Sequence, residues 1–306
     1  WVKDPSQRPS FEDILSRFKN DFELLSDIDD VLFYDYVDFL ENSPTQNAFS
    51  EIDQFKFINI QDFQQEGNSS IVSQYITSLK QVLLNGNSFL LPNRWFTDLE
   101  RINIGQKMDQ SSTMDRYKGL ERASHQPLSL QIFRNEITPE SNQIFNDLNR
   151  ILNIHMKLYH PAIIALYGFS PIDYNYSFKP IIFTKFYSVG SLERIINLTH
   201  QTVIQELDDI EKFIIIYGIC EGMSYLHNNS IVHSNLNSHN ILLTDQNYPL
   251  IKNFCNSEIL PNDSQLSITR KKFDVFSFGL IAYELLNNKL ISNPNIEDIQ
   301  QKIANF

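Results

Sequence analysis

The stretch Ser224-Tyr-Leu-His-Asn-Asn-Ser-Ile-Val-His233-Ser-Asn235-Leu-Asn237-Ser-His-Asn240-Ile-Leu-Leu243, followed by Ile251-Lys-Asn253-Phe-Cys255, says most about the fold of this chain. Its apolar positions and its spacing suit a loop that positions a phosphoryl group for transfer. Such chemistry needs an aspartate as base, a lysine near the phosphate, and an asparagine and a second aspartate for the metal ions. Asparagine stands at all four of these places, so the pattern favours the fold and argues against the chemistry.

Composition limits the remaining possibilities. The chain has 306 residues, 42% of them hydrophobic and 12% aromatic, which is ample for a packed core. The net charge is −12, and residues 1–100 carry 17 acids and 7 bases. We therefore expect no nucleic-acid and no membrane partner. This acidic front half fits a solvated helix face, or less readily an acidic docking surface. Two cysteines cannot build a disulfide framework, which indicates a reducing, cytoplasmic location.

The first part of the chain reads as helices and linker. Residues 1–20 predict a Pro-marked turn and a helix with Ser10 as N-cap and Asp13 three positions later. Helical spacing of apolar residues continues through 21–41 and returns at 70–84, whereas 42–68 is a polar linker.

From about Arg94 the pattern changes to a small β-rich lobe followed by a helical lobe. Strands are expected at 99–104, 114–119, 128–133, 163–169 and 180–186, with a helix at 140–158. Helices are expected at 192–198, 207–228, 274–287 and 296–304. The fold class is therefore α+β.

The loop is similar to the catalytic loop of protein kinases. His233 to Asn240 resembles His-Arg-Asp-Leu-Lys-x-x-Asn, and Asn253-Phe-Cys255 resembles Asp-Phe-Gly. The resemblance implies that Asn235 replaces the base, Asn237 the lysine and Asn253 the metal-binding aspartate, while Asn240 keeps its metal-binding amide. Taken alone, these eight residues fit an Asn-rich turn equally well.

Six further stretches resemble other kinase motifs and make the family resemblance specific. The resemblance implies that Asp274 props up the loop. The first of the six, Trp1 to Phe11, resembles the closing signature of a tyrosine-kinase-like domain but precedes the rest. The other five are Leu128 to Phe133 (the lysine strand), His160 to Gly168 (the next turn and strand), Phe183 to Leu192 (the hinge), Tyr217 to His227 (the long helix) and Asp274 to Gly279.

Further positions depart from the kinase pattern. The resemblance places Gln131 at the phosphate-binding lysine and Ile151 at the helix glutamate, while Asp109, Ser111 and Met114 replace the loop glycines. Other nucleotide-binding positions are implied at Thr184, Phe186 and Leu242. Arg116 and Ser129 stand where apolar residues usually pack on adenine, which disfavours nucleotide binding. Lys118 could be a relocated phosphate lysine, although a lysine is common there in active kinases.

The segment between Asn253 and Asp274 is short and places Ser264, Ser267 and Thr269 in a polar loop, where they could be phosphorylation sites or plain loop residues. His200 and His227 are expected to cap helices or pack. No spacing suits zinc.

These observations predict three regions. Residues 1–20 would be the C-terminal tail of an upstream kinase domain, 21–93 an acidic helical and linker region, and 94–306 a bilobal kinase-like domain that stops before its own closing signature. Without closing helices, the large lobe would expose apolar surface and need a partner.

We expect a pseudokinase that regulates or scaffolds signalling by binding another protein, such as the upstream kinase domain, with no cofactor. Two alternatives stay open. One is a serine/threonine kinase that binds ATP and magnesium and whose activity lies mainly upstream. The other is a module that senses nucleotide without transferring phosphate.

Overall fold

A computed structural model describes residues 4–20, 30–43, 99–111, 113–136, 148, 150–152, 154–155, 158–170, 172–175, 177–261 and 264–291. The chain divides into two compact units. One holds residues 44–157 and 165–186, and the other holds 1–43, 158–164 and 187–306. The α+β, kinase-like fold class predicted from the sequence is confirmed.

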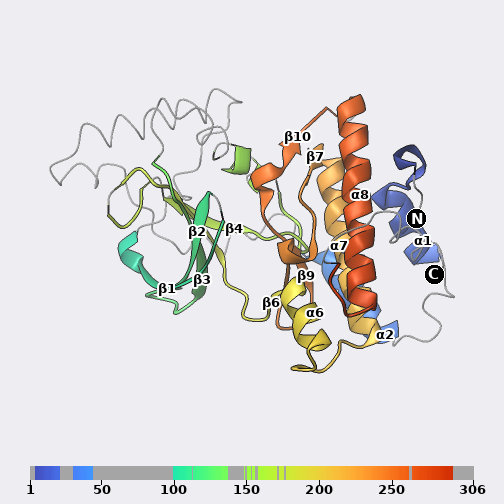
Figure 1. The fold of residues 1–306 in the computed structure, drawn as a ribbon, viewed down its shortest axis with the longest axis horizontal. Helices are drawn as coiled ribbons and strands as arrows, with labels where there is room; N and C mark the ends of the chain where they lie inside the picture. The colour runs from blue at the N-terminus through green and yellow to red at the C-terminus, as the bar shows by residue number, and fades with distance from the viewer. Residues whose placement is uncertain are drawn as a thin grey trace. The chain divides into compact units, whose positions relative to one another are not determined.

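The β-rich unit is an antiparallel five-stranded sheet in the order β1-β2-β3-β5-β4 (Figure 1). A short 3-10 helix, Leu99–Arg101, precedes it, so the first predicted strand begins three residues late and extends further than expected. Alternating apolar residues form the core of this sheet, with Ile102, Leu128, Leu130 and Phe183 almost fully buried. The strands are β1 (Ile102–Gln110), β2 (Met114–Glu121), β3 (Pro127–Phe133), β4 (Leu166–Ser170) and β5 (Ile181–Lys185).

The predicted strand at 163–169 begins later than expected. Ile163 makes only an isolated bridge to Ile251 in the helical unit, and regular pairing with β5 starts at Leu166. Of the helix predicted at 140–158, the described residues between Leu148 and His155 are helical. The helices predicted at 70–84 and 296–304 lie outside the described residues, as do residues 21–29.

The helical unit is built around one buried helix. Its members are α1 (Phe11–Asn20), α2 (Asp30–Asn42), α6 (Leu192–His200), α7 (Asp209–Asn228) and α8 (Gln265–Leu286). Helix α7 is apolar on nearly every side because α1, α2, α8 and β9 all pack against it (Figure 1). Its start is fixed by a capping box, in which Asp208 and Glu211 each bond the other's backbone N–H.

Short strands and 3-10 turns carry the loop of interest. The strands are β6 (Gly190–Ser191), β7 (Ile231–Val232), β8 (Ile241–Leu243), β9 (Pro249–Ile251) and β10 (Glu258–Ile259). The 3-10 helices are η1 (Pro5–Gln7), η6 (Ser238–Asn240) and η7 (Phe254–Asn256). Strands β8 and β9 form the hairpin expected between Asn235 and Asn253.

Helix α8 corrects one prediction. It begins at Gln265, nine residues before the predicted start, because Ser264 caps it by accepting the backbone N–H of Ser267. Ser267 and Thr269 are therefore helical rather than in a loop, and Ser267 is fully buried. A buried hydroxyl cannot meet a kinase active site, so the phosphorylation reading of Ser267 is wrong in this structure.

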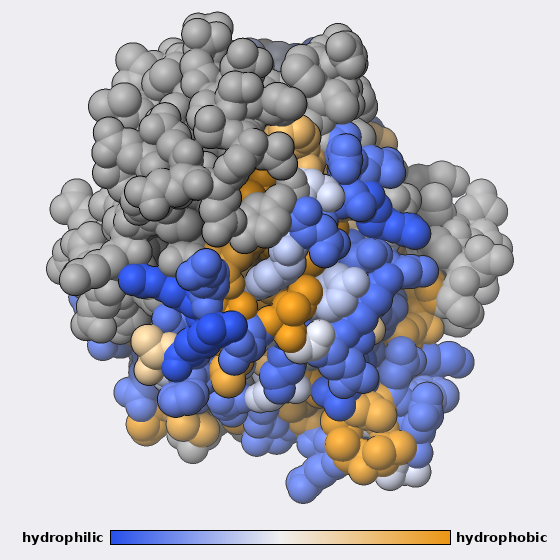
Figure 2. Space-filling model, turned by 90° about the vertical axis from the view of Figure 1, so that its left-hand side faces the viewer, coloured by the Kyte–Doolittle hydropathy of each residue, from blue (hydrophilic) through white to orange (hydrophobic). Residues whose placement is uncertain are grey.

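Among the described residues, no helix has the length and apolarity needed to cross a bilayer. On the face shown in Figure 2, hydrophilic side chains predominate and the hydrophobic surface is broken into small patches.

Candidate functional site

The loop between β7 and β8 is held from below by a buried carboxylate. Asp274 on α8 is 1% exposed, and its two oxygens accept the backbone N–H groups of His233 (2.8 Å) and Ser234 (2.9 Å). A ring N–H of His227 donates to the same carboxylate at 3.0 Å. Ser234 has a positive φ of 61°, so these bonds fix a strained turn. The supporting role expected for Asp274 is what the structure shows.

His233 anchors the loop from the inside. Its Nδ1 accepts the backbone N–H of Asn235 (3.3 Å), so its Nε2 carries the proton and donates to the carbonyl of Lys252 (3.1 Å). Burial lowers the pKa of His233, and this keeps the ring neutral as the bonding pattern requires. The ring also lies edge-on to Phe254, 5.5 Å between centroids. These contacts connect the loop to the segment that follows β9.

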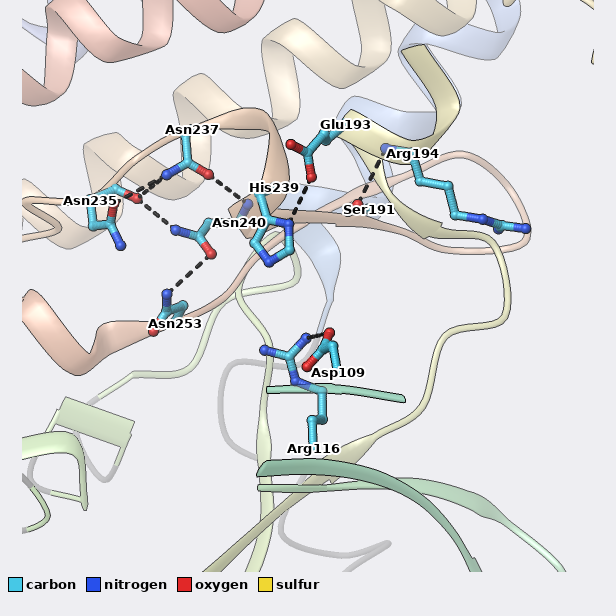
Figure 3. A network of polar contacts seen from close by, with 10 residues as sticks. All are labelled: Asp109, Arg116, Ser191, Glu193, Arg194, Asn235, Asn237, His239, Asn240 and Asn253. Atoms are coloured by element: carbon cyan, nitrogen blue, oxygen red, sulfur yellow. Dashed lines mark hydrogen bonds and ion pairs between the residues drawn. The ribbon is translucent and has the colours of Figure 1, made fainter. Parts of the chain in front are cut away.

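Four asparagine side chains point toward one another above this support (Figure 3). Asn237 donates to the backbone and side-chain oxygens of Asn235 (3.2 and 3.1 Å), and its own Oδ1 accepts the backbone N–H of Asn240 (3.1 Å). The Asn240 amide donates to the Asn235 carbonyl at 2.8 Å. Asn253, in a left-handed conformation with φ of 73°, donates to Asn240 Oδ1 at 3.1 Å. We call these four residues the amide network.

The amide network does not fit a magnesium nucleotide. Magnesium prefers carboxylate and phosphate oxygens in an octahedral shell, and all four side chains here are neutral. Asn253 donates its amide N–H to Asn240 Oδ1, so the oxygen that the resemblance assigns to the metal accepts a hydrogen bond from a neighbouring side chain instead. Within the described ranges, no three His, Cys, Asp or Glu side chains come together as a metal site would require.

Beside the amide network, η6 meets the start of α6. His239 and Glu193, both exposed, form an ion pair or hydrogen bond of 2.8 Å (Figure 3). Ser191 caps α6 by accepting the backbone N–H of Arg194. Leu242 on β8 is partly buried and pairs with Ser191 and Leu250. These contacts brace the loop and bring no acid or base into the amide network.

The β-rich unit contains the other predicted positions. Gln131 on β3 is partly buried and lies opposite Arg116 on β2 and Ile182 on β5. Ile151 is 3% exposed within its helical segment, so an apolar residue is buried at the implied glutamate position. Thr184 is buried on β5, opposite Ser129.

The β1–β2 hairpin has its own ion pair. Arg116 binds Asp109 at 2.8 Å, and both come from positions expected to face nucleotide. Ser111 lies in the turn and Met114 begins β2 as a buried residue. Lys118 extends over the Phe186 ring, 4.7 Å from its centroid, which is a cation–π contact. In the described part of this hairpin, these contacts replace the Gly-rich geometry that cradles phosphate in an ATP-binding hairpin.

The sequence missed two contributors to the loop. His227 was expected only to cap or pack, yet it binds Asp274, 47 positions away. Ser257 donates its hydroxyl to the carbonyl of His233 at 3.0 Å. His227 ends the stretch that resembles the long helix, but its contact with Asp274 and that of Ser257 with His233 join residues far apart in sequence, so only the fold shows them.

Comparison with known proteins gives one family match. The model of the family "Protein tyrosine and serine/threonine kinase" matches residues 117–272, just over half of the chain. The match runs from β2 into α8 and includes the amide network.

Relatives of the chain are named as kinases. The dual specificity protein kinase pyk3 of Dictyostelium discoideum is 22% identical over 306 residues, 95% of this chain and 19% of that protein. The serine/threonine-protein kinase TNNI3K of Mus musculus is 27% identical over 222 residues, 65% of this chain and 25% of that protein. The calmodulin-binding receptor kinase CaMRLK of Arabidopsis thaliana is 34% identical over 89 residues, 29% of this chain and 13% of that protein. The chain thus spans at most a quarter of the length of these relatives.

Proposed function

The chain belongs to the protein tyrosine and serine/threonine kinase family, and from this premise we propose that its kinase-like domain is catalytically impaired and works by binding another protein. The observation that carries the proposal is the amide network, in which Asn240 and Asn253 bond each other. A neutral network supplies no base, no phosphate cation and no paired metal oxygens. The network therefore stabilises the loop but provides no reactive group.

Magnitudes support this reading. Removing a catalytic base, a phosphate lysine or a metal carboxylate typically costs an enzyme several powers of ten each, at about 1.4 kcal/mol per factor of ten in rate. Positions Asn235, Asn237 and Asn253 carry all three losses at once, and Gln131 adds a fourth. The remaining Asn240 amide cannot offset them.

The retained features are those that hold shape. His233, Leu236, Phe254 and Asp274 are all at most 4% exposed and pack or bond as a loop scaffold. A chain that keeps the scaffold and loses the charges is suited to presenting a surface. We propose a protein partner, for which an upstream kinase domain is the first candidate, and no nucleic-acid or membrane partner. Two free cysteines are consistent with a cytoplasmic location.

A second candidate function is an active or nucleotide-sensing kinase domain. The names of the relatives favour it, since pyk3 and TNNI3K are both called kinases. The Arg116–Asp109 ion pair opposes it, because that arginine lies on the strand that would face adenine and is held by a carboxylate.

Phosphate transfer tests the proposal directly. The chain is incubated with radiolabelled ATP, magnesium and a mixed protein substrate, next to the matched variant Asn240→Ala. We expect labelling no greater than in a protein-free control for both. Labelling by the unaltered chain that the variant loses would overturn the proposal, because a contaminating kinase would be indifferent to Asn240.

A thermal-shift series separates binding from transfer. ATP alone, magnesium alone and both together are compared with buffer, and we expect no shift of the melting temperature. The positive control restores the charges by Asn235→Asp, Asn237→Lys, Asn253→Asp and Gln131→Lys. A shift in the unaltered chain without transfer would favour nucleotide sensing.

A further inference from the structure

The first described residues of the chain pack on the helical unit more than 200 positions later in sequence. Phe11, at the start of α1, is 1% exposed and makes edge contacts with the rings of His227 (5.1 Å) and Phe278 (5.4 Å). Its backbone carbonyl accepts the thiol of Cys220 on α7 at 3.6 Å. The start of α1 therefore contacts both α7 and α8.

Arg8 fixes the approach to this helix. It is 6% exposed, donates to the backbone carbonyl of Lys272 at 3.0 Å, and lies 4.8 Å from the centre of the Phe276 ring. Lys272 in turn donates to the backbone carbonyl of Arg8. A buried arginine with reciprocal backbone bonds specifies one position on α8, since its planar guanidinium fits only where its donors are matched.

Helix α2 continues the contact along α7. Phe33 is 3% exposed and packs against Phe213 (5.0 Å) and Tyr217 (5.1 Å). Tyr36 is fully buried and lies 4.4 Å from the Tyr248 ring. Gly218 lets Tyr36 approach, because any side chain there would collide with the Tyr36 hydroxyl. In Figure 1, α1 and α2 both lie along the orange helices.

These contacts lead to the amide network. Phe11 covers His227, His227 bonds Asp274, and Asp274 holds the backbone of the loop. Removing Phe11 would admit water to a buried histidine–carboxylate pair and weaken its bonds. The N-terminal segment is thus coupled to the loop by a continuous chain of three contacts within one unit.

We propose that residues 4–20 and 30–42 are docking elements that the chain supplies to its own helical unit, and that their seating on α7 and α8 keeps the loop from Ser234 to Asn240 ordered. The resemblance of the chain's first stretch to a kinase closing signature fits this use, because its described residues Arg8 and Phe11 pack on the unit that follows them in sequence. The occupant is the chain's own segment. The proposal is independent of phosphate transfer, so its failure and that of the proposed function are separately visible.

The test uses the full chain with a specific protease site inserted between Ser43 and Pro44. After cleavage, native mass spectrometry and gel filtration report whether the fragment ending at Ser43 stays bound. We expect one complex with one copy of each fragment. Separate elution of a folded remainder would overturn the proposal, and so would a dimer that exchanges segments between two copies.

Labelled synthetic peptides of residues 4–42 give a test that needs no folded variant. Each labelled peptide competes with the bound N-terminal fragment of the cleaved complex, and the amount of peptide bound is measured as a function of peptide concentration. We expect the peptide with Arg8→Ala to bind at least tenfold more weakly than the unaltered one. The peptide with Arg17→Ala, the same change at an exposed position of α1, should match the unaltered peptide. Equal affinities for the two variants would overturn the docking mode.

Hydrogen exchange then tests the coupling to the loop. In the cleaved complex, displacement of the unaltered segment by an excess of a Phe11→Ala peptide, which lacks the ring that covers His227, should raise exchange of residues 233–240 at least tenfold. Exchange in the sheet, at residues 116–132, serves as the control and should stay within twofold. Loop exchange that does not respond would overturn the coupling.

Discussion

Replacing Asp274 by asparagine tests the central support of the loop. The carboxylate accepts three hydrogen bonds, from the N–H groups of His233 and Ser234 and from His227. Asparagine has nearly the same shape but only one acceptor oxygen. Its NH₂ group must face one of the three donors, which leaves that donor unpaired and buried.

The size of the effect follows from the number of bonds. A hydrogen bond to a charged group contributes about 1.5–3 kcal/mol and a neutral one about 0.5–1.5 kcal/mol. Asp274→Asn loses one charged bond and weakens the other two, which amounts to roughly 3.5–6 kcal/mol. Relief of the buried charge offsets part of this, so we expect a net loss of about 2–4 kcal/mol in local stability. At about 1.4 kcal/mol per factor of ten, the loop should open about 30 to 700 times more often.

Hydrogen exchange of residues 227–240 measures this opening, because the amides of His233 and Ser234 exchange only when the loop opens. Asp245→Asn is the matched control, since Asp245 is exposed and accepts a single hydroxyl from Ser188. Its effect should stay within about 0.5 kcal/mol. Exchange that rises less than threefold in Asp274→Asn, or equally in both variants, would refute the reasoning.

Three further predictions concern the packing of the helical unit. Burial lowers the pKa of His160 to about 4, below the usual 6.5, so the unfolded chain binds more protons in acid. The free energy of unfolding should therefore be highest above pH 6.5 and fall by up to about 3 kcal/mol toward pH 4. Urea titrations at several pH values should show a smaller fall for His160→Gln and the same fall for the exposed-site control His200→Gln. Tyr36→Phe removes a buried hydroxyl without a hydrogen-bond partner among the described residues, so urea midpoints should stay equal or rise by up to about 1 kcal/mol, and a clear loss would contradict this. Gly218→Ala should destabilise by about 1–3 kcal/mol in the same titration, because the new methyl would meet the Tyr36 hydroxyl and come within 2.6 Å of Pro249, and the loss should be smaller when the change is made in Tyr36→Phe.

Local patterns predicted most of the elements. Helix α1 begins after Ser10, where Ser10 and Asp13 exchange bonds as the spacing indicated, because a cap is made by residues three positions apart. Strands β2, β3 and β5 lie within two residues of their predicted ends, since alternation of apolar side chains reports a half-buried strand directly. The kinase-like order of elements followed from these local signals and the loop motif together.

The start of α8 was missed because its first turns look unhelical. Residues 265–269 include the β-branched Ile268 and Thr269 and the small polar Ser267, which have modest helix propensity. The cap at Ser264 outweighs this, as does the burial of Ser267 against the rest of the unit. Propensity is a weak signal, and tertiary packing decided the boundary here.

For the candidate site, the four asparagines could be identified from the motif, but the hydrogen bonds between them could not. Which amide faces which depends on the left-handed backbone at Asn253 and on the Asp274 support, both of which are long-range features. The contact of Arg8 with Lys272, 264 positions later, also could not be predicted from the sequence. The roles of Gln131 and Ile151, and the domain boundaries at residues 20 and 94, stay predictions.

The amide network also explains why the loop can persist after losing its charges. A pair of carboxylates at the positions of Asn235 and Asn253 would repel each other and the lone pairs of Asn240, and a cation would be needed to offset that repulsion. An amide both donates and accepts, so the same backbone can close its hydrogen bonds with no ion at all. Each such bond contributes about 0.5–1.5 kcal/mol, and together they stabilise the loop without an ion. Under the proposed function, a loop ordered in this way would present its surface to a protein partner without first binding a ligand, which a nucleotide switch could not do.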